Sequence, residues 1–99
     1  MSDQATLRAV IFKDGDQWIA QALECDICAQ GPDLDTLRER FLDTLSAEQQ
    51  LAHEAGVDLV ADIGPAPAHF FSMWDERSQF SKSIKMKGDN AKLELALCA

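Results

Sequence analysis

The chain has 99 residues, which is enough for one domain but not for two independent hydrophobic cores. Its composition, 46% hydrophobic and 26% charged, is typical of a globular protein and excludes a disordered or fibrous one. The longest apolar runs, such as the four residues Ala9–Phe12, are far shorter than the ~20 residues that a membrane-spanning helix needs.

The formal charge of −8 is unevenly distributed along the chain. Residues 1–76 hold 15 acidic and 4 basic residues, a net charge of −11, whereas residues 77–99 hold 2 acidic and 5 basic residues, a net charge of +3. An acidic body repels the phosphate backbone, so we do not expect binding to nucleic acid. A basic partner protein fits this charge better, although solubility alone is the simpler explanation.

The first residues, Met1-Ser2-Asp3, lead into a strand-like pattern without the basic and apolar segments of an export signal. We therefore predict a cytoplasmic protein that does not associate with membranes. In that reducing compartment its three cysteines, Cys25, Cys28 and Cys98, are expected to be free thiols.

Three strands are predicted at the start of the chain. Thr6–Lys13 is rich in β-branched and aromatic residues, and Asp14-Gly15-Asp16 is typical of a hairpin turn. Gln17–Glu24 is the second strand and Asp26–Gln30 the third, so the three form an antiparallel meander. On the second strand, alternation places Trp18, Ala20 and Ala22 on one face and Ile19, Gln21 and Leu23 on the other.

The spacing of apolar residues then changes to that of a helix. Asp33 is well placed to cap its N-terminus, and Gly56 to end it, so a helix of up to ~22 residues is predicted. The stripe expected to cover the sheet consists of Leu34, Leu37, Phe41, Leu45 and Ala52.

The rest of the chain has a weaker pattern. Val57–Gly64 is expected to be an extended link, and Pro65-Ala66-Pro67 to begin a second helix, the two together filling residues 57–80. Residues 81–91, rich in lysine, serine and glycine, are expected to form a mobile basic loop. Lys92–Leu97 alternates as a half-buried final strand does. The chain is thus one α+β domain over residues 1–99, of order β-β-β-α-α-β.

No metal or redox motif is complete. The Cys25-Asp26-Ile27-Cys28 spacing resembles half of a zinc site, but no second pair completes the tetrahedron. On a strand, side chains three residues apart also point to opposite faces. His53 and His69 lie on different predicted helices and are not part of a two-histidine motif. We predict no metal ion and no cofactor.

The two close pairs of carboxylates also lack the features of a catalytic site. Asp14 and Asp16 flank a turn glycine, which is ordinary turn chemistry. Glu24 and Asp26 lie at a strand junction with no sign of the burial that would raise a carboxyl pKa for acid–base work. We therefore predict that the protein is not an enzyme and has no catalytic residue.

The second helix carries an unusual set of large apolar side chains, Phe70, Phe71, Met73 and Trp74. Four such side chains at successive angles around a short helix cannot all face one small core. They either close the domain or form a contact with a partner or a second copy, where aromatic residues and methionine are enriched.

The first half of the chain resembles the HicB-like antitoxin family. The resemblance is carried by Val10–Gln21 with its Trp-x-Ala motif, by Leu23-Glu24, by Ala29-Gln30-Gly31 with its Gln-Gly ending, and by the helix start Asp33–Leu37. It covers roughly residues 9–45. In that family a hairpin and a short third strand ending in Gln-Gly lead to an amphipathic helix.

The resemblance implies a sheet of order 3-2-1-4 covered by helices, a reduced relative of the ribonuclease H arrangement, with the final strand beside the first. It also implies a non-catalytic protein that binds a small basic RNA-cleaving toxin, HicA. This chain is then expected to be a stand-alone HicB-like domain without a DNA-binding module, and a homodimer. The expected partner-binding residues are Asp14, Asp16, Trp18, Glu24, Phe70, Phe71 and Trp74.

Two other functions stay open at this stage. One is a small-ligand-binding protein or enzyme with a pocket between the sheet and the aromatic helix, using His69 and a nearby acid. The other is direct RNA binding through the basic segment Lys82–Lys92.

Overall fold

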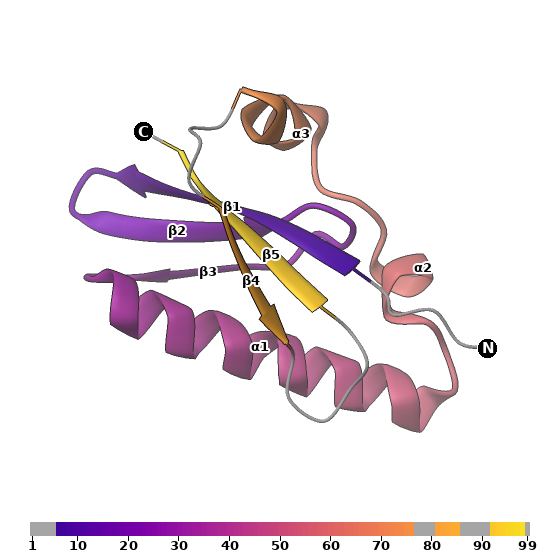
Figure 1. Cartoon of the computed structure of the whole chain (residues 1–99). Helices are drawn as coiled ribbons and strands as arrows, with labels where there is room; N and C mark the ends of the chain where they lie inside the picture. Colours follow the sequence, from indigo (N-terminus) through magenta and orange to yellow (C-terminus); the bar gives the residue numbers. More distant parts are fainter. Residues whose placement is uncertain (1–5, 77–80, 86–91, 99) are drawn as a thin grey trace.

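The computed structural model describes residues 6–76, 81–85 and 92–98 (Figure 1). Of Thr6, residues 81–85 and Lys92 it describes the backbone alone. In chain order the elements are β1 (Thr6–Asp14), β2 (Gln17–Ala22), β3 (Cys28–Gly31), α1 (Leu34–Ala55), α2 (Leu59–Ile63), α3 (Ala68–Asp75), β4 (Ser81–Lys85) and β5 (Lys92–Leu97).

The strands form one mixed sheet of order β3-β2-β1-β5-β4. β1 pairs antiparallel with β2 and parallel with β5, and β2 pairs antiparallel with β3. The predicted order 3-2-1-4 is therefore confirmed for the four predicted strands, with the final strand beside the first.

The prediction of a basic loop over 81–91 was wrong for its first part. β4 is a fifth strand that pairs antiparallel with β5, and residues 86–91 lie outside the described part of the chain. An edge strand needs a hydrogen-bonding partner on one side only and tolerates lysine well. A polar segment can therefore be a strand without showing the alternation on which the prediction relied.

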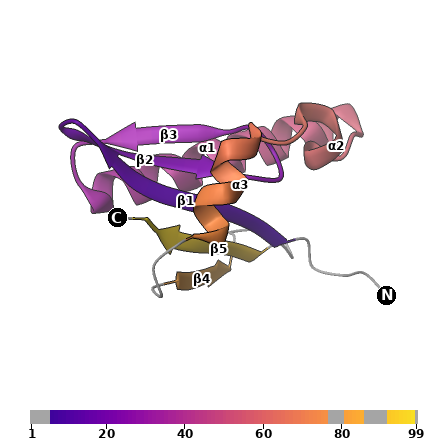
Figure 2. The same ribbon diagram turned by 90° about the horizontal axis from the view of Figure 1, so that it is seen from above.

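Helices lie on both faces of the sheet, α1 on one and α3 on the other (Figures 1 and 2). Alternation along β1 serves both layers, because Leu7 and Ala9 belong to the core beneath α1 while Val10 belongs to the core beneath α3. The core beneath α1 is the larger one and includes the buried residues Ala20, Ala22, Cys25, Ile27, Leu37, Phe41, Leu45, Ala52, Leu59, Leu93 and Leu95. The core beneath α3 is formed by Val10, Leu23, Trp74 and Ala96.

Both ends of α1 are fixed as the sequence predicts. The Asp33 carboxylate accepts hydrogen bonds from the Thr36 backbone N–H at 2.7 Å and from the Thr36 hydroxyl at 3.1 Å. These bonds hold the pKa of Asp33 below its usual range. At the other end Gly56 has a φ of 71°, the left-handed conformation that glycine adopts without strain.

The predicted stripe of α1 is confirmed at four of its five positions. Leu37, Phe41, Leu45 and Ala52 are buried, but Leu34 is 43% exposed. The reason is the position of the helix, which packs on β2 and β3 rather than over the centre of the sheet. Leu34 therefore extends beyond the covered part of the sheet.

The second half of the chain departs from the prediction in two further places. The link expected over Val57–Gly64 contains α2, whose N-terminus is capped by Asp58 and whose Leu59 is buried. The helix that follows is shorter than expected, since α3 begins after Pro67 and ends at Asp75. Among the described residues, no helix has both the length and the apolar character needed to cross a bilayer.

The buried stripe of α1 gives a direct test of this packing. Leu45 is fully buried, so Leu45→Ala is expected to lower the free energy of unfolding by about 2–5 kcal/mol. Leu51 lies on the same helix but is 60% exposed, so Leu51→Ala should change the free energy of unfolding by less than about 0.5 kcal/mol. Urea unfolding of both variants measures the difference, and equal losses would contradict the packing described here.

Gly31, the glycine of the Gln-Gly ending, allows α1 to start directly against β3. A Cβ at this position would lie 3.0 Å from the backbone nitrogen of Leu37 and 3.2 Å from its Cα. Since these are helix backbone atoms, they cannot move aside as the end of a flexible side chain does.

Gly31→Ala is therefore expected to destabilise the protein by about 1–3 kcal/mol through overpacking. Gln30→Ala, at the exposed neighbouring position of the same strand, is the matched control and should stay within about 0.5 kcal/mol of the wild type. Urea unfolding separates the two. A Gly31→Ala protein as stable as the wild type would show that α1 can shift away from β3.

Candidate partner-binding surface

The β1–β2 hairpin presents two exposed carboxylates. Asp14 and Asp16 flank Gly15, which has a φ of 63° in the turn. The hairpin turn predicted at Asp14-Gly15-Asp16 is therefore confirmed. Both remain available to solvent at the end of the hairpin.

Trp18 lies on the face of the sheet that α1 covers. It is half-buried against the larger core, and the Lys13 Nζ lies 5.6 Å from the centroid of its ring. Trp18 shares this face with Ala20 and Ala22, as the alternation along β2 predicts, and α3 lies on the opposite face.

Glu24 forms an ion pair with Arg8. Its carboxylate accepts hydrogen bonds from the Arg8 backbone N–H at 2.7 Å and from the Arg8 Nε at 2.6 Å. The guanidinium lies 5.4 Å from the ring of Phe71 and 5.6 Å from that of Trp74. Glu24 therefore positions a cation against the aromatic rings of α3, and its role within the structure is to help hold that helix to the sheet.

The aromatic residues of α3 divide between core and surface. Trp74 is 7% exposed and belongs to the core beneath α3. Phe70 and Phe71 are half-buried, and Phe70 stacks on Phe12 with ring centroids 6.1 Å apart. The seven predicted partner-binding residues thus lie on both faces of the sheet and do not form one continuous surface.

His69 is exposed and lies against Phe70, with the ring centroids 3.9 Å apart. A cavity between helix and sheet lies beneath α1, and none of its lining residues comes from α3. This cavity is therefore not the pocket between the sheet and the aromatic helix that the sequence suggested, and His69 does not line it.

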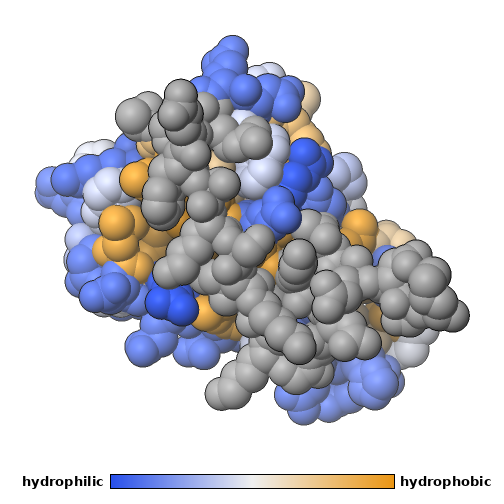
Figure 3. Space-filling model, viewed as in Figure 1, coloured by the Kyte–Doolittle hydropathy of each residue, from blue (hydrophilic) through white to orange (hydrophobic). Residues whose placement is uncertain are grey.

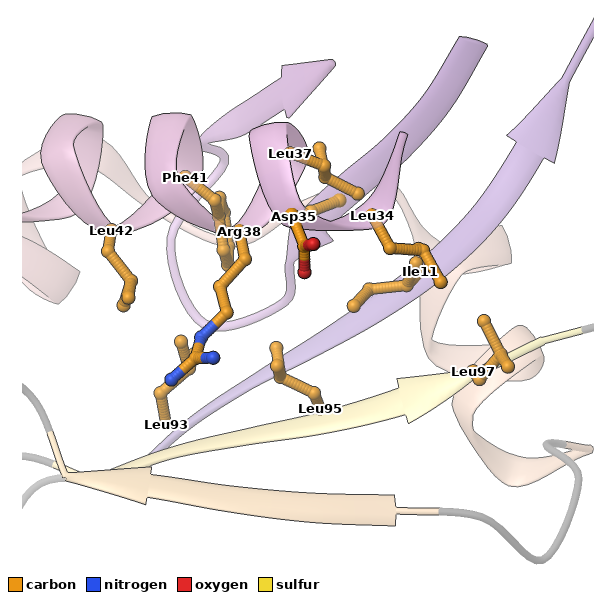
Figure 4. Close-up of a pocket in the computed structure, with 11 residues that line it drawn as sticks. Ile11, Leu34, Asp35, Leu37, Arg38, Phe41, Leu42, Leu93, Leu95 and Leu97 are labelled. Atoms are coloured by element: carbon orange, nitrogen blue, oxygen red, sulfur yellow. The ribbon is translucent and has the colours of Figure 1, made fainter. Parts of the chain in front are cut away.

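We call this cavity the α1–β5 groove; it has a volume of about 240 Å³ and is shown in Figure 4. Its walls come from α1 on one side and from β1, β2 and β5 on the other. The lining is apolar except for Asp35 and Arg38 and consists of Ile11, Ala20, Leu34, Asp35, Leu37, Arg38, Phe41, Leu42, Leu93, Leu95 and Leu97. The sequence did not reveal this site, because the leucines that line it have the same spacing as residues of a core.

Two charged side chains line this groove, the acidic Asp35 and the basic Arg38, and further acids follow along α1. Asp35, Glu39 and Asp43 recur every four residues along α1 and are exposed. Basic residues elsewhere in the described body make internal contacts, as Arg8 and Lys13 do, and Arg40 donates a hydrogen bond to the Gln30 carbonyl oxygen at 3.0 Å. On the face seen in Figure 3, hydrophilic side chains predominate and apolar patches lie between them. The protein therefore presents carboxylates outward beside an apolar groove.

The cysteines occupy different environments. Cys25 is buried and Cys28 exposed, so the two do not converge on one site. Burial raises the pKa of the Cys25 thiol to about 11, and the nearby carboxylates of Glu24 and Asp26 add to the shift. In the part of the chain that the structure describes, no three His, Cys, Asp or Glu side chains gather in a group that could hold a metal ion.

Comparisons of this chain with protein-family models, with curated proteins and with solved structures find no match.

The two thiols of the Cys-x-x-Cys segment should differ strongly in reactivity. At pH 8 a thiol whose pKa is about 11 is ionised to only about one part in a thousand, and Cys25 is also shielded by burial. We expect a disulfide reagent to label Cys28 rapidly and Cys25 only as the protein unfolds, with peptide mass spectrometry giving the site of labelling. In denaturant both should react at similar rates. Equal rates in the folded protein would contradict the burial of Cys25.

Proposed function

We propose that this chain is a non-catalytic, HicB-like interaction module that binds a basic partner protein in the cytoplasm. The observation that carries the proposal is the arrangement of charge on α1. Its exposed carboxylates, Asp35, Glu39 and Asp43, form an outward row. Of the basic residues, Arg8 and Arg40 make contacts within the domain, and Arg38 lines the groove beside the row. Such a surface attracts a basic protein and accelerates its association.

The fold supports a HicB-like module as the more specific form of the proposal. The resemblance implies a meander followed by one long helix, with the final strand beside the first, and the sheet has that order. Gly31, from the Gln-Gly motif, lies where α1 meets β3. A small basic toxin of the HicA type is the partner that the resemblance favours.

A homodimer is the oligomeric state that we propose for this module. The half-buried rings of Phe70 and Phe71 on α3 are the apolar side chains that would meet in such a contact. They lie on the face opposite α1, so a dimer formed through them leaves the acidic row of α1 available to the partner.

Binding of a small molecule is the second candidate, and the α1–β5 groove is the observation that favours it. Ligand pockets usually enclose about 300–1,000 Å³ and bury most of the ligand. At about 240 Å³ the groove is smaller than that range. An apolar fragment would fit, but a drug-sized metabolite would remain largely outside.

The proposal is tested by recovering the partner and measuring its affinity. Affinity capture on the 99-residue chain from its own cells is expected to return a small basic protein, and binding of the purified pair should weaken as salt rises from about 50 to about 500 mM. Reversing two charges, Glu39→Lys with Asp43→Lys, should weaken the complex by about tenfold or more, because like charges then face each other. Isothermal calorimetry gives the affinities.

The matched control reverses two exposed carboxylates on the other side of the sheet, Asp75→Lys with Glu76→Lys. It changes the net charge by the same amount, so it should weaken binding clearly less if the α1 surface is the contact. Equal losses would show that only net charge matters. Recovery of no partner, or of an acidic one, would overturn the proposed function.

A further inference from the structure

The α1–β5 groove exists because α1 does not cover the whole sheet. The helix packs on β2 and β3, so the strands beyond them form a floor with the helix as a wall on one side only. Figure 4 shows Leu34 and Leu42 projecting from α1 on the side where Leu95 and Leu97 rise from β5. Leu34 is 43% exposed at this site and lies beside the other apolar side chains of the groove.

The dimensions of the groove favour side chains over a whole small molecule. Leu34 and Leu42 are eight residues apart on α1, which corresponds to about 12 Å along the helix axis. Together with a volume of about 240 Å³, this gives room for a few apolar side chains along one or two turns of a partner segment. A helix that presents apolar residues three and four positions apart has that spacing.

Charge at the rim distinguishes between possible occupants. Asp35 lines the groove, and Glu39 and Asp43 continue the acidic row along the same helix. A second copy of this chain carries a formal charge of −8 and the same row, so it would be repelled there. A segment with lysine or arginine beside its apolar residues would instead gain favourable contacts.

Arg38 sets the orientation of such a segment. Its side chain extends from α1 toward Leu93, so its aliphatic part adds to the apolar wall while its guanidinium lies beside Leu93 (Figure 4). A cationic side chain is therefore disfavoured at that position. The basic residues of the partner belong at the Asp35 side of the groove, and neutral or acidic ones near Arg38.

From these observations we infer that the α1–β5 groove is the docking site for a short apolar and basic segment of the partner protein, whose apolar side chains fill the groove while its lysine or arginine residues pair with the carboxylates of α1. This inference rests on the proposed function and makes it more specific. It locates the contact on α1, on the opposite side of the sheet from α3, and assigns Leu34 to binding instead of folding.

A displayed library of random peptides of about 12 residues, selected on the immobilised 99-residue chain, provides the probe. We expect enriched peptides to carry apolar residues three or four apart with lysine or arginine nearby. Fluorescence anisotropy of the synthesised peptides then gives affinities for the wild type and its variants. Leu34→Lys should weaken binding by about tenfold or more, because it places a cation in the groove.

Leu51→Lys is the matched control, with the same helix, residue type and charge change, at a leucine that is 60% exposed outside the groove. It should leave peptide affinity within about twofold of the wild type. A second pair, Asp35→Asn and Asp43→Asn, tests charge without altering the apolar lining. Of the two residues only Asp35 lines the groove, so Asp35→Asn should weaken peptide binding more than Asp43→Asn does.

Four results would each overturn the inference: no enriched peptide, enrichment of acidic peptides, equal affinity for Leu34→Lys and the wild type, or equal loss with Leu51→Lys.

Native mass spectrometry could give two further results that overturn it. A small molecule that copurifies with the wild type and is lost from Leu34→Lys would assign the groove to a ligand. A dimer that Leu34→Lys converts to monomer would assign it to a second copy.

Failure of this inference is distinguishable from failure of the proposed function. A basic partner that binds Leu34→Lys as tightly as the wild type leaves the proposed function standing and removes the groove from it. Conversely, groove-dependent peptides together with no basic partner in cells would support the docking site and overturn the proposed function.

Discussion

Burial of β1 and β5 on both faces is the constraint on which the rest of the structure depends. Val10 and Ala9 are neighbours in β1 and both are fully buried, although their side chains belong to opposite cores. A sheet whose central strands are apolar on both sides must have a layer over each. One long helix cannot supply both layers, so α3 is as necessary to the fold as α1, and Trp74 is its buried anchor.

The two helical layers are held in different ways. α1 covers its face through a long buried stripe and is fixed at both ends by Asp33 and Gly56. α3 is only eight residues long and is anchored by Trp74. In addition, Glu24 pairs with Arg8 and holds the Arg8 guanidinium against the Trp74 ring. Because that ion pair is partly exposed, it orients the helix more than it stabilises it. The buried Trp74 side chain therefore contributes most of the attachment of α3 to the sheet.

Patterns that repeat were predictable from the sequence, and features set by a single contact were not. The meander, α1 with its caps and the strand over Lys92–Leu97 follow from alternation and helical spacing. α2 depends on the Asp58 cap and on burial of Leu59, and β4 depends on β5 beside it, so neither has a periodic signal. For the candidate site, the sequence pointed to Trp18 and Trp74 but could not show that the sheet separates them.

Leu34 illustrates why the groove in particular could not be predicted. Helical spacing gives the angle of a side chain around its axis, and by that measure Leu34 belongs with Leu37 and Phe41. Burial also depends on where the helix lies on the sheet, which the contact of Gly31 with the start of α1 helps to fix. That contact holds α1 toward β3 and leaves its other flank beside β5 uncovered. The same close approach that stabilises one side of the helix therefore leaves room for the apolar groove on the other.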